Sequence, residues 1–361
     1  MSSNETRKLV LETGEEFYGT AFGSRQDKVS ELVFNTSMAG YQEILSDPSY
    51  TDQTVVMTYP LIGNYGINPE DFECESPSVS GFIVRDYNDF PSNFRSTETL
   101  SETMERFGIV GLSGIDTRKL TRIIREKGTV RSLITSSDRS KEDCLKFLAG
   151  SKVPHDQVLR VSPAAIKTIP ANEERFRVVA IDCGMKENIV RSFNDRGVTV
   201  IRVPFDTKAA VIEELKPDGI FISNGPGDPE DAVPVIETIK ELRGRYPIFG
   251  ICLGHQIISL ACGAKTYKLK FGHRGGNHPV KNLLTDKIEI TSQNHSYAVK
   301  NDSLEGTGLV VTHINLLDNT VEGVECAKDR IFGVQFHPES APGPNDSGYL
   351  FDRFIKMLEA K

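Results

Sequence analysis

The chain has 361 residues, of which 38% are hydrophobic and 25% charged, and its formal net charge is −8. This length predicts about two domains, and an acidic chain without a basic block argues against a nucleic-acid or anionic-membrane partner. No apolar stretch is long enough for a membrane span, and the polar start Met1–Lys8 lacks the pattern of a signal peptide.

The cysteines predict free thiols. They are scattered at positions 74, 144, 183, 252, 262 and 326, and no two of them form a Cys-x-x-Cys pair. Neither a zinc ribbon nor a thioredoxin-type motif is therefore expected. Free thiols without a leader pattern predict a cytoplasmic location.

Residues 1–150 are expected to form the smaller of two domains, of α+β type. Strand-like runs broken by Gly, Pro and Asp occur at Lys8–Leu11, Glu31–Asn35, Thr54–Tyr59 and Gly81–Arg85. One helix is predicted, with Asp116 or Thr117 as its N-cap and Gly128 as its stop. Residues 151–176 are polar and rich in proline, and we expect them to connect the two domains.

Residues 177–361 alternate between strand and helix patterns, which predicts an α/β domain with a doubly wound, mostly parallel sheet. The predicted strands are Val178–Asp182, Val198–Val203, Gly219–Ser223 and Pro247–Ile251. The predicted helices are Lys186–Arg196, Ala209–Leu215, Val233–Arg243, Leu253–Cys262 and Gly348–Leu358. After Gly263 the sequence becomes richer in strands, which are expected to extend the sheet.

Cys252 stands between two glycines, after a strand and before a helix, in Gly250–Gly254. This pattern is typical of a nucleophile elbow. The glycines would relieve crowding in a sharp turn, and the thiol would be exposed above the sheet edge. The helix N-terminus would favour the thiolate. A buried core cysteine beside a helix-capping glycine is the alternative interpretation.

A second motif, Phe336–Glu339, favours the catalytic interpretation. Pro338 biases His337 toward an extended backbone, and residues two apart in an extended chain point the same way. Glu339 can therefore orient the imidazole of His337. On its own the motif would be interpreted as a surface turn, but together with Cys252 it supplies a thiol, a base and an orienting acid.

These motifs resemble those of a known family. Residues 248–256, with Ser223–Pro229 upstream and His337–Glu339 downstream, are similar to the class I (triad) glutamine amidotransferases, over about residues 177–361. Four further segments resemble the small, glutamine-hydrolysing subunit of carbamoyl-phosphate synthase, so that the resemblance spans nearly the whole chain. They are Phe34–Tyr50, Tyr59–Gly66, Ile115–Thr121 and Lys270–Val280.

The resemblance implies hydrolysis of the glutamine side-chain amide, with Cys252 as nucleophile, His337 as acid and base, and Glu339 as the residue that orients His337. The N–H groups of Gly227 and Leu253 would form the oxyanion hole. The glutamine-binding positions carried over from the family are Ser49, Gly225, Gly227, Leu253, Gln256, Asn294, Ser296 and Tyr297. Many bacterial relatives have Gly and Phe at the positions of Ser296 and Tyr297, which leaves main-chain contacts possible there.

The resemblance also implies a large synthetase subunit as partner in a heterodimer, which would make carbamoyl phosphate for arginine and pyrimidine synthesis from ammonia, bicarbonate and ATP. The chain has no Walker-type phosphate loop, so ATP and Mg²⁺ are expected on the partner, with no cofactor or metal here. His273, His278 and Cys262 match no common zinc spacing. Two alternatives are an amidotransferase subunit of another synthase and a non-catalytic regulatory homologue.

Overall fold

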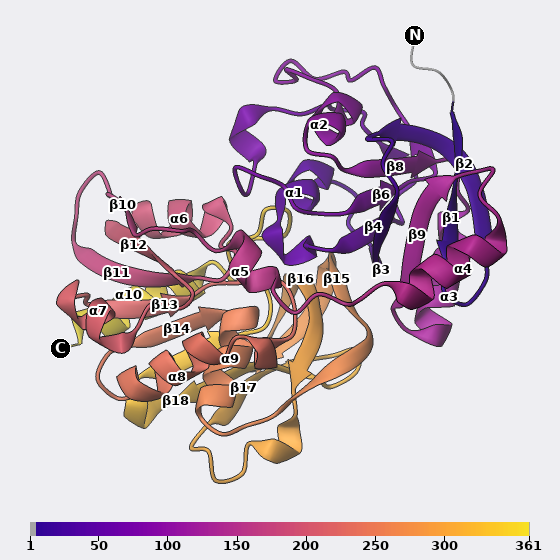
Figure 1. Cartoon of the computed structure of the whole chain (residues 1–361). Coiled ribbons are helices and arrows are strands. Elements are labelled where there is room, and N and C mark those ends of the chain that lie inside the picture. Colours follow the sequence, from indigo (N-terminus) through magenta and orange to yellow (C-terminus); the bar gives the residue numbers. More distant parts are fainter. Residues whose placement is uncertain (1–4, 361) are drawn as a thin grey trace. The chain divides into compact units, whose positions relative to one another are not determined.

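The computed structural model describes residues 5–360, and the chain divides into two compact units, Met1–Pro154 and His155–Lys361 (Figure 1). Residues 1–4, which belong to the polar start Met1–Lys8, and residue 361 lie outside the described residues. Within residues 5–360, no helix is both long and apolar enough to cross a membrane.

The first unit is built on a closed barrel with strand order β1-β2-β8-β6-β4-β3-β9. Its strands are β1 (Thr6–Leu11), β2 (Glu16–Gly23), β3 (Lys28–Asn35), β4 (Gln53–Met57), β6 (Gly81–Ile83), β8 (Val110–Ser113) and β9 (Val130–Ser136). A separate pair consists of β5 (Leu61–Ile62) and β7 (Asp86–Tyr87). The helices of the first unit are α1 (Tyr41–Ser46), α2 (Leu100–Arg106), α3 (Thr117–Lys127) and α4 (Lys141–Gly150).

The α+β prediction for this unit is confirmed, and the predicted strands are present with ends shifted by a few residues. The predicted helix is α3: the Asp116 carboxylate accepts from the N–H of Lys119, and Gly128 ends the helix at φ 96°. Helices α1, α2 and α4 were not predicted. For α2 the sequence did hold a signal, because Thr99 and Glu102 form a capping box.

The second unit contains a ten-stranded sheet with strand order β10-β12-β11-β13-β14-β19-β18-β16-β15-β17. Its strands are β10 (Lys167–Ile169), β11 (Phe176–Asp182), β12 (Val198–Pro204), β13 (Gly219–Ile222), β14 (Ile248–Ile251), β15 (Thr266–Asn282), β16 (Lys287–Val299), β17 (Val310–Asn315), β18 (Val321–Cys326) and β19 (Ile331–Val334). Strands β12, β11, β13, β14 and β19 pair in parallel. The strands after Gly263 extend this parallel part through antiparallel pairs, as the sequence predicted.

Helices cover both faces of this sheet, as expected for a doubly wound domain (Figure 1). They are α5 (Gln157–Val161), α6 (Glu187–Asn194), α7 (Ala209–Glu214), α8 (Val233–Leu242), α9 (Leu253–Ala261) and α10 (Tyr349–Glu359). Alternate residues of β11 divide between two apolar clusters, with Val178 packing beside α6 and α10 and Val179 beside α7, α8 and α9. This alternation follows from the period of two in a strand.

Much of the segment 151–176 is part of the second unit. The unit begins at His155, α5 follows at once, and β10 adds to the sheet by pairing antiparallel with β12. The polar composition that predicted a linker reflects an edge strand and a short helix with exposed faces. The connection between the units is therefore shorter than the sequence suggested.

Candidate active site

Cys252 forms the turn between β14 and α9, where the sequence predicted a nucleophile elbow. Its backbone has φ 53° and ψ −103°, a conformation that residues other than glycine rarely adopt and that occurs where surrounding structure enforces it. The thiol stands at the N-terminus of α9.

The expectation of an exposed thiol is wrong, because Cys252 is only 2% exposed. Its sulfur donates to the carbonyl oxygen of Asn294 on β16 at 3.5 Å and accepts from Nε2 of Gln335 at 3.7 Å. Strand β16 and the residue after β19 therefore cover the sulfur. The sequence pattern described the turn but contained no information on these distant residues.

The two flanking glycines are required by close packing around the elbow. A Cβ on Gly254 would lie 2.1 Å from the carbonyl oxygen of Ile222 at the end of β13, and a Cβ on Gly250 would lie 2.6 Å from the carbonyl oxygen of Gly254. Both neighbours are backbone atoms, which cannot rotate away as a side chain can. The glycines thus let β13, β14 and α9 approach each other beneath the thiol.

Replacement of Gly254 by alanine should lower the thermal unfolding midpoint, even though alanine is the better helix former. Helix propensity favours alanine by up to about 1 kcal/mol, whereas overpacking against fixed backbone costs about 1–3 kcal/mol. Gly150→Ala is the control, because no atom lies within 4 Å of the added Cβ there. Equal midpoints for the two variants would show that the elbow is not tightly packed.

His337 and Glu339 form the second part of the site, directly after β19. Nδ1 of His337 lies 2.7 Å from Oε1 of Glu339, so both side chains lie on one side, as the His-Pro-Glu motif predicted. Burial lowers the pKa of His337, but the Glu339 carboxylate and then the Cys252 side chain outweigh it and raise the pKa above its ordinary value. The other ring nitrogen, Nε2, has no hydrogen bond of normal geometry with any residue in the range 5–360.

Lys186 is a residue of the site that the sequence analysis missed. Its ammonium group lies 2.9 Å from Oε1 of Glu339 and 2.7 Å from the carbonyl oxygen of Ser340, and both charged side chains are buried. Burial raises the pKa of Glu339, but the charges of Lys186 and His337 lower it to about 2. Glu339 therefore stays ionised while it orients His337.

Several of the predicted glutamine-binding residues gather around Cys252. The side chain of Leu253 packs against Gly225, where an added Cβ would lie 2.9 Å from its Cδ2. Nε2 of Gln256 donates to the carbonyl oxygen of Tyr297 at 2.7 Å. Together with the contact between Cys252 and Asn294, these interactions bring residues of α9, β16 and the loop after β13 to one place.

The remaining predicted positions lie as follows. Gly227 is in the same loop as Gly225 and has φ +89°. The hydroxyl of Ser296 accepts from the Arg274 guanidinium at 2.5 Å, so this side chain is engaged within the protein. Ser49 belongs to the first unit, where it lies in the 3-10 helix η1 (Pro48–Tyr50) and is buried.

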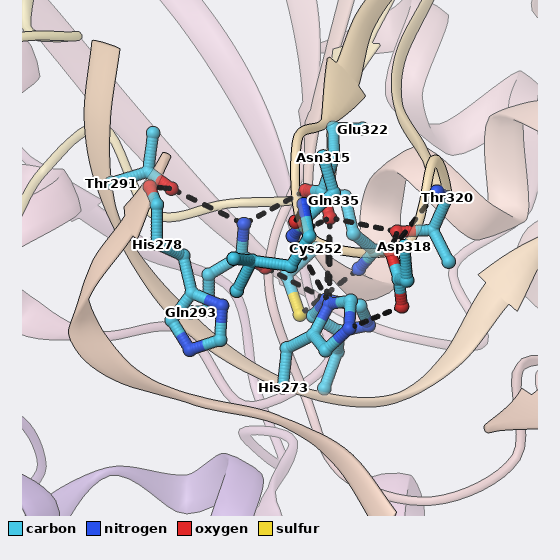
Figure 2. A network of polar contacts seen from close by, with 12 residues as sticks. Cys252, His273, His278, Thr291, Gln293, Asn315, Asp318, Thr320, Glu322 and Gln335 are labelled. Carbon is cyan, nitrogen blue, oxygen red and sulfur yellow. Dashed lines mark hydrogen bonds and ion pairs between the residues drawn. The ribbon is translucent and has the colours of Figure 1, made fainter. Parts of the chain in front are cut away.

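A polar network extends from Cys252 into the antiparallel part of the sheet (Figure 2). Gln335 accepts from Nε2 of Gln256 at 3.0 Å, and Nδ1 of His295 lies 2.7 Å from the Tyr297 carbonyl that Gln256 also contacts. Nε2 of His295 lies 2.8 Å from Oε1 of Gln293. The segment of β16 that lies over the thiol is thus fixed by side-chain hydrogen bonds.

His273 lies in this network with His295 and Glu322, three residues whose ligand atoms are close enough to hold a metal ion. Nε2 of His273 lies 2.9 Å from Asp318, and Nδ1 lies 3.5 Å from Glu322. Burial lowers the pKa of His273, but these two carboxylates raise it to about 9. A protonated His273 places a positive charge beside the buried Glu322 carboxylate.

Comparison with known proteins matches each of the two parts of the chain to a protein family. Residues 179–357 match the family described as glutamine amidotransferase class-I, and residues 9–134 match the family described as carbamoyl-phosphate synthase small chain, CPSase domain. The first match contains Cys252, His337 and Glu339, and the second covers most of the barrel unit.

Similar proteins cover almost the full length. The chain is 54% identical to a carbamoyl phosphate synthase small chain of Fusobacterium nucleatum, over 98% of each sequence. It is 53% identical to a carbamoyl phosphate synthase pyrimidine-specific small chain of Bacillus subtilis, over 98% of this chain and 96% of that protein. The chain therefore belongs to the carbamoyl-phosphate synthase small-chain family and carries a class I glutamine amidotransferase domain.

Proposed function

We propose that this chain is the glutamine-hydrolysing subunit of a carbamoyl-phosphate synthase, and that it releases ammonia through a thioester on Cys252. The observation that carries the proposal is the buried arrangement of Cys252, His337 and Glu339, with Lys186 holding Glu339 ionised. It contains a nucleophile, a base and an orienting acid, the components of an activated thiol.

In the first half of the reaction, the Cys252 thiolate attacks the side-chain amide carbon of glutamine. The N–H groups of Leu253 and Gly227 would stabilise the resulting oxyanion, and a lost donor of this kind costs about 3 kcal/mol. The C–N bond then breaks while the His337 imidazolium gives its proton to the leaving nitrogen. The products of this half are ammonia and a γ-glutamyl thioester.

In the second half, water attacks the thioester and neutral His337 takes its proton. The C–S bond breaks, which returns the thiolate and releases glutamate. The imidazolium of His337 is thereby restored, ready for the next glutamine. Glu339 keeps Nδ1 of His337 as a donor throughout, so Nε2 faces the reacting atoms in both halves.

The ammonia would pass to a large synthetase subunit, which forms a heterodimer with this chain in the cytoplasm and uses bicarbonate and ATP with Mg²⁺. No cofactor or metal would be bound here. Carbamoyl phosphate serves arginine and pyrimidine synthesis, and one similar protein is named pyrimidine-specific. Family membership supports this partner over that of another synthase, and the complete triad supports an enzyme over a regulatory homologue.

The test is to follow the amide nitrogen through the reconstituted complex. The chain and a large carbamoyl-phosphate synthase subunit are mixed with ATP, bicarbonate and glutamine labelled with ¹⁵N at the amide, in the presence of unlabelled ammonium. We expect ¹⁵N in carbamoyl phosphate, measured by mass spectrometry. Absence of label from the product, or failure of the two subunits to co-purify, would refute the proposal.

A further inference from the structure

Residues 183–186, which connect β11 to α6, carry Lys186 to the triad and are here called the lysine turn. The ammonium group of Lys186 lies 2.9 Å from Oε1 of Glu339 and 2.7 Å from the carbonyl oxygen of Ser340. The lysine side chain is long and flexible, and it is held in one buried position. A shift of its backbone would therefore displace the ammonium group from Glu339.

Asp182, the last residue of β11, holds the middle of the lysine turn. Its Oδ1 accepts from the N–H of Gly184 at 2.8 Å and from the N–H of Met185 at 2.7 Å. Gly184 has φ 120°, a conformation that other residues rarely adopt. Met185 is also buried in the apolar cluster that contains Phe336. Apolar packing has no preferred direction, so the hydrogen bonds to Asp182 set the orientation of these peptides.

The two ends of the lysine turn are fixed by the residues that follow β13. The N–H of Cys183 donates to Oγ of Ser223 at 2.9 Å, and the N–H of Lys186 donates to Oδ1 of Asn224 at 3.2 Å. All four N–H groups of the lysine turn thus donate to side chains. Asp182 supplies the acceptor for the two peptides that lead directly to Lys186.

Arg202 on β12 holds the carboxylate of Asp182 in place. Oδ2 of Asp182 accepts from Nε of Arg202 at 2.8 Å and lies 2.7 Å from Nη2, and the aspartate side chain is buried. Nη1 of Arg202 donates to Oε1 of Glu187, the first residue of α6, at 2.5 Å. The planar fork of the guanidinium suits such a double contact. Arg202 therefore joins the residues immediately before and after the lysine turn.

We propose that Asp182 is a positioning residue for glutamine hydrolysis, which fixes the lysine turn so that the ammonium group of Lys186 stays on Glu339. The inference rests on the proposed function and adds a residue that acts through Lys186. A displaced ammonium group would leave His337 less firmly oriented by Glu339. The loss should therefore fall on the proton transfers by His337 and not on the binding of glutamine.

The experiment compares two double variants in the reconstituted complex, Asp182→Asn/Arg202→Met and Asp182→Ala/Arg202→Met. Both lack the two charges of the buried ion pair, so neither leaves one charge uncompensated. They differ in the amide group, whose oxygen can still accept from the lysine turn. We expect kcat for glutamine hydrolysis, measured as glutamate released, to be about tenfold lower with alanine than with asparagine, with KM changed less than about twofold.

The same pair of double variants in a Lys186→Met background separates positioning from a general packing defect. Without an ammonium group to position, the asparagine and alanine forms should have equal kcat, whereas a packing defect would lower kcat alike in both backgrounds. Asp218 provides a matched control, because it accepts from the N–H of Arg177 at 2.9 Å near the opposite end of β11. Asp218→Asn and Asp218→Ala should have equal kcat.

Equal kcat for the asparagine and alanine forms with Lys186 present would overturn the inference. So would a tenfold difference that persists in the Lys186→Met background, or an alanine form whose thermal unfolding shows that it does not fold. Synthesis from ammonium by the same complexes should be equal in all variants. A wild-type complex that uses ammonium but not glutamine would instead refute the proposed function, so the two failures are distinguishable.

Discussion

Replacement of Cys252 by alanine should abolish carbamoyl phosphate synthesis from glutamine by the reconstituted complex, while synthesis from ammonium continues. The alanine variant has no atom that can form the thioester, and removal of a triad nucleophile can cost on the order of 10⁶ in kcat. Ammonium bypasses glutamine hydrolysis and needs only the partner. Both rates are measured as carbamoyl phosphate formed under saturating ATP and bicarbonate.

The matched control is Cys262→Ala at the opposite end of helix α9. Cys262 is also buried, and burial raises the pKa of its thiol to about 11, which leaves it an unreactive packing group. This variant should retain glutamine-dependent synthesis. Loss of both glutamine- and ammonium-dependent rates in Cys252→Ala would mean that Cys252 has a structural role, and retention of both would exclude it as the nucleophile.

Replacement of Lys186 by methionine should lower both the free energy of unfolding and the rate of glutamine-dependent carbamoyl phosphate synthesis. Methionine keeps an unbranched chain but removes the cation that lies 2.9 Å from Glu339. Loss of one partner from a buried ion pair typically costs about 3–5 kcal/mol, because the other charge is left uncompensated. The pKa of Glu339 should rise, and a carboxyl group that takes up a proton orients His337 less well.

The pH dependence gives Lys186→Met a signature of its own. The pKa of Glu339 is lowered from 4.5 to about 2 in the folded protein, so its stabilising contribution is complete above pH 4.5 and is lost as the pH falls toward 2. In Lys186→Met, much of this pH-dependent contribution to the free energy of unfolding should be lost. It is measured by chemical denaturation from pH 3 to 7.

Lys208→Met is the control for Lys186→Met, because Lys208 also precedes a helix but is exposed. It should change neither the stability nor the glutamine-dependent rate. If Lys186→Met behaved like Lys208→Met in both measurements, the buried cation would have no part in orienting the triad.

The sequence was informative wherever function depends on residues close together in the chain. The Gly250–Gly254 pattern specifies a strand, a sharp turn and a helix, and Pro338 places His337 and Glu339 on one side within three residues. The alternation of strands and helices after residue 177 likewise predicted the doubly wound sheet. Each of these features has a fixed spacing, because strand and helix periods are properties of the local backbone.

The tertiary structure decided everything that depends on distant residues. Lys186 is 153 positions from Glu339, and nothing in a lysine before a helix indicates a buried carboxylate as its partner. Three further features also depend on residues that are distant in the chain. They are the covering of the Cys252 thiol by β16, the closure of the first unit into a barrel and the packing of Gln157 on Gly227. By itself the sequence predicted which groups carry the chemistry, and it determined their local geometry. Their burial, ionisation and restraint arise from contacts that form only when the chain folds, because charge and desolvation act through space and not along the chain.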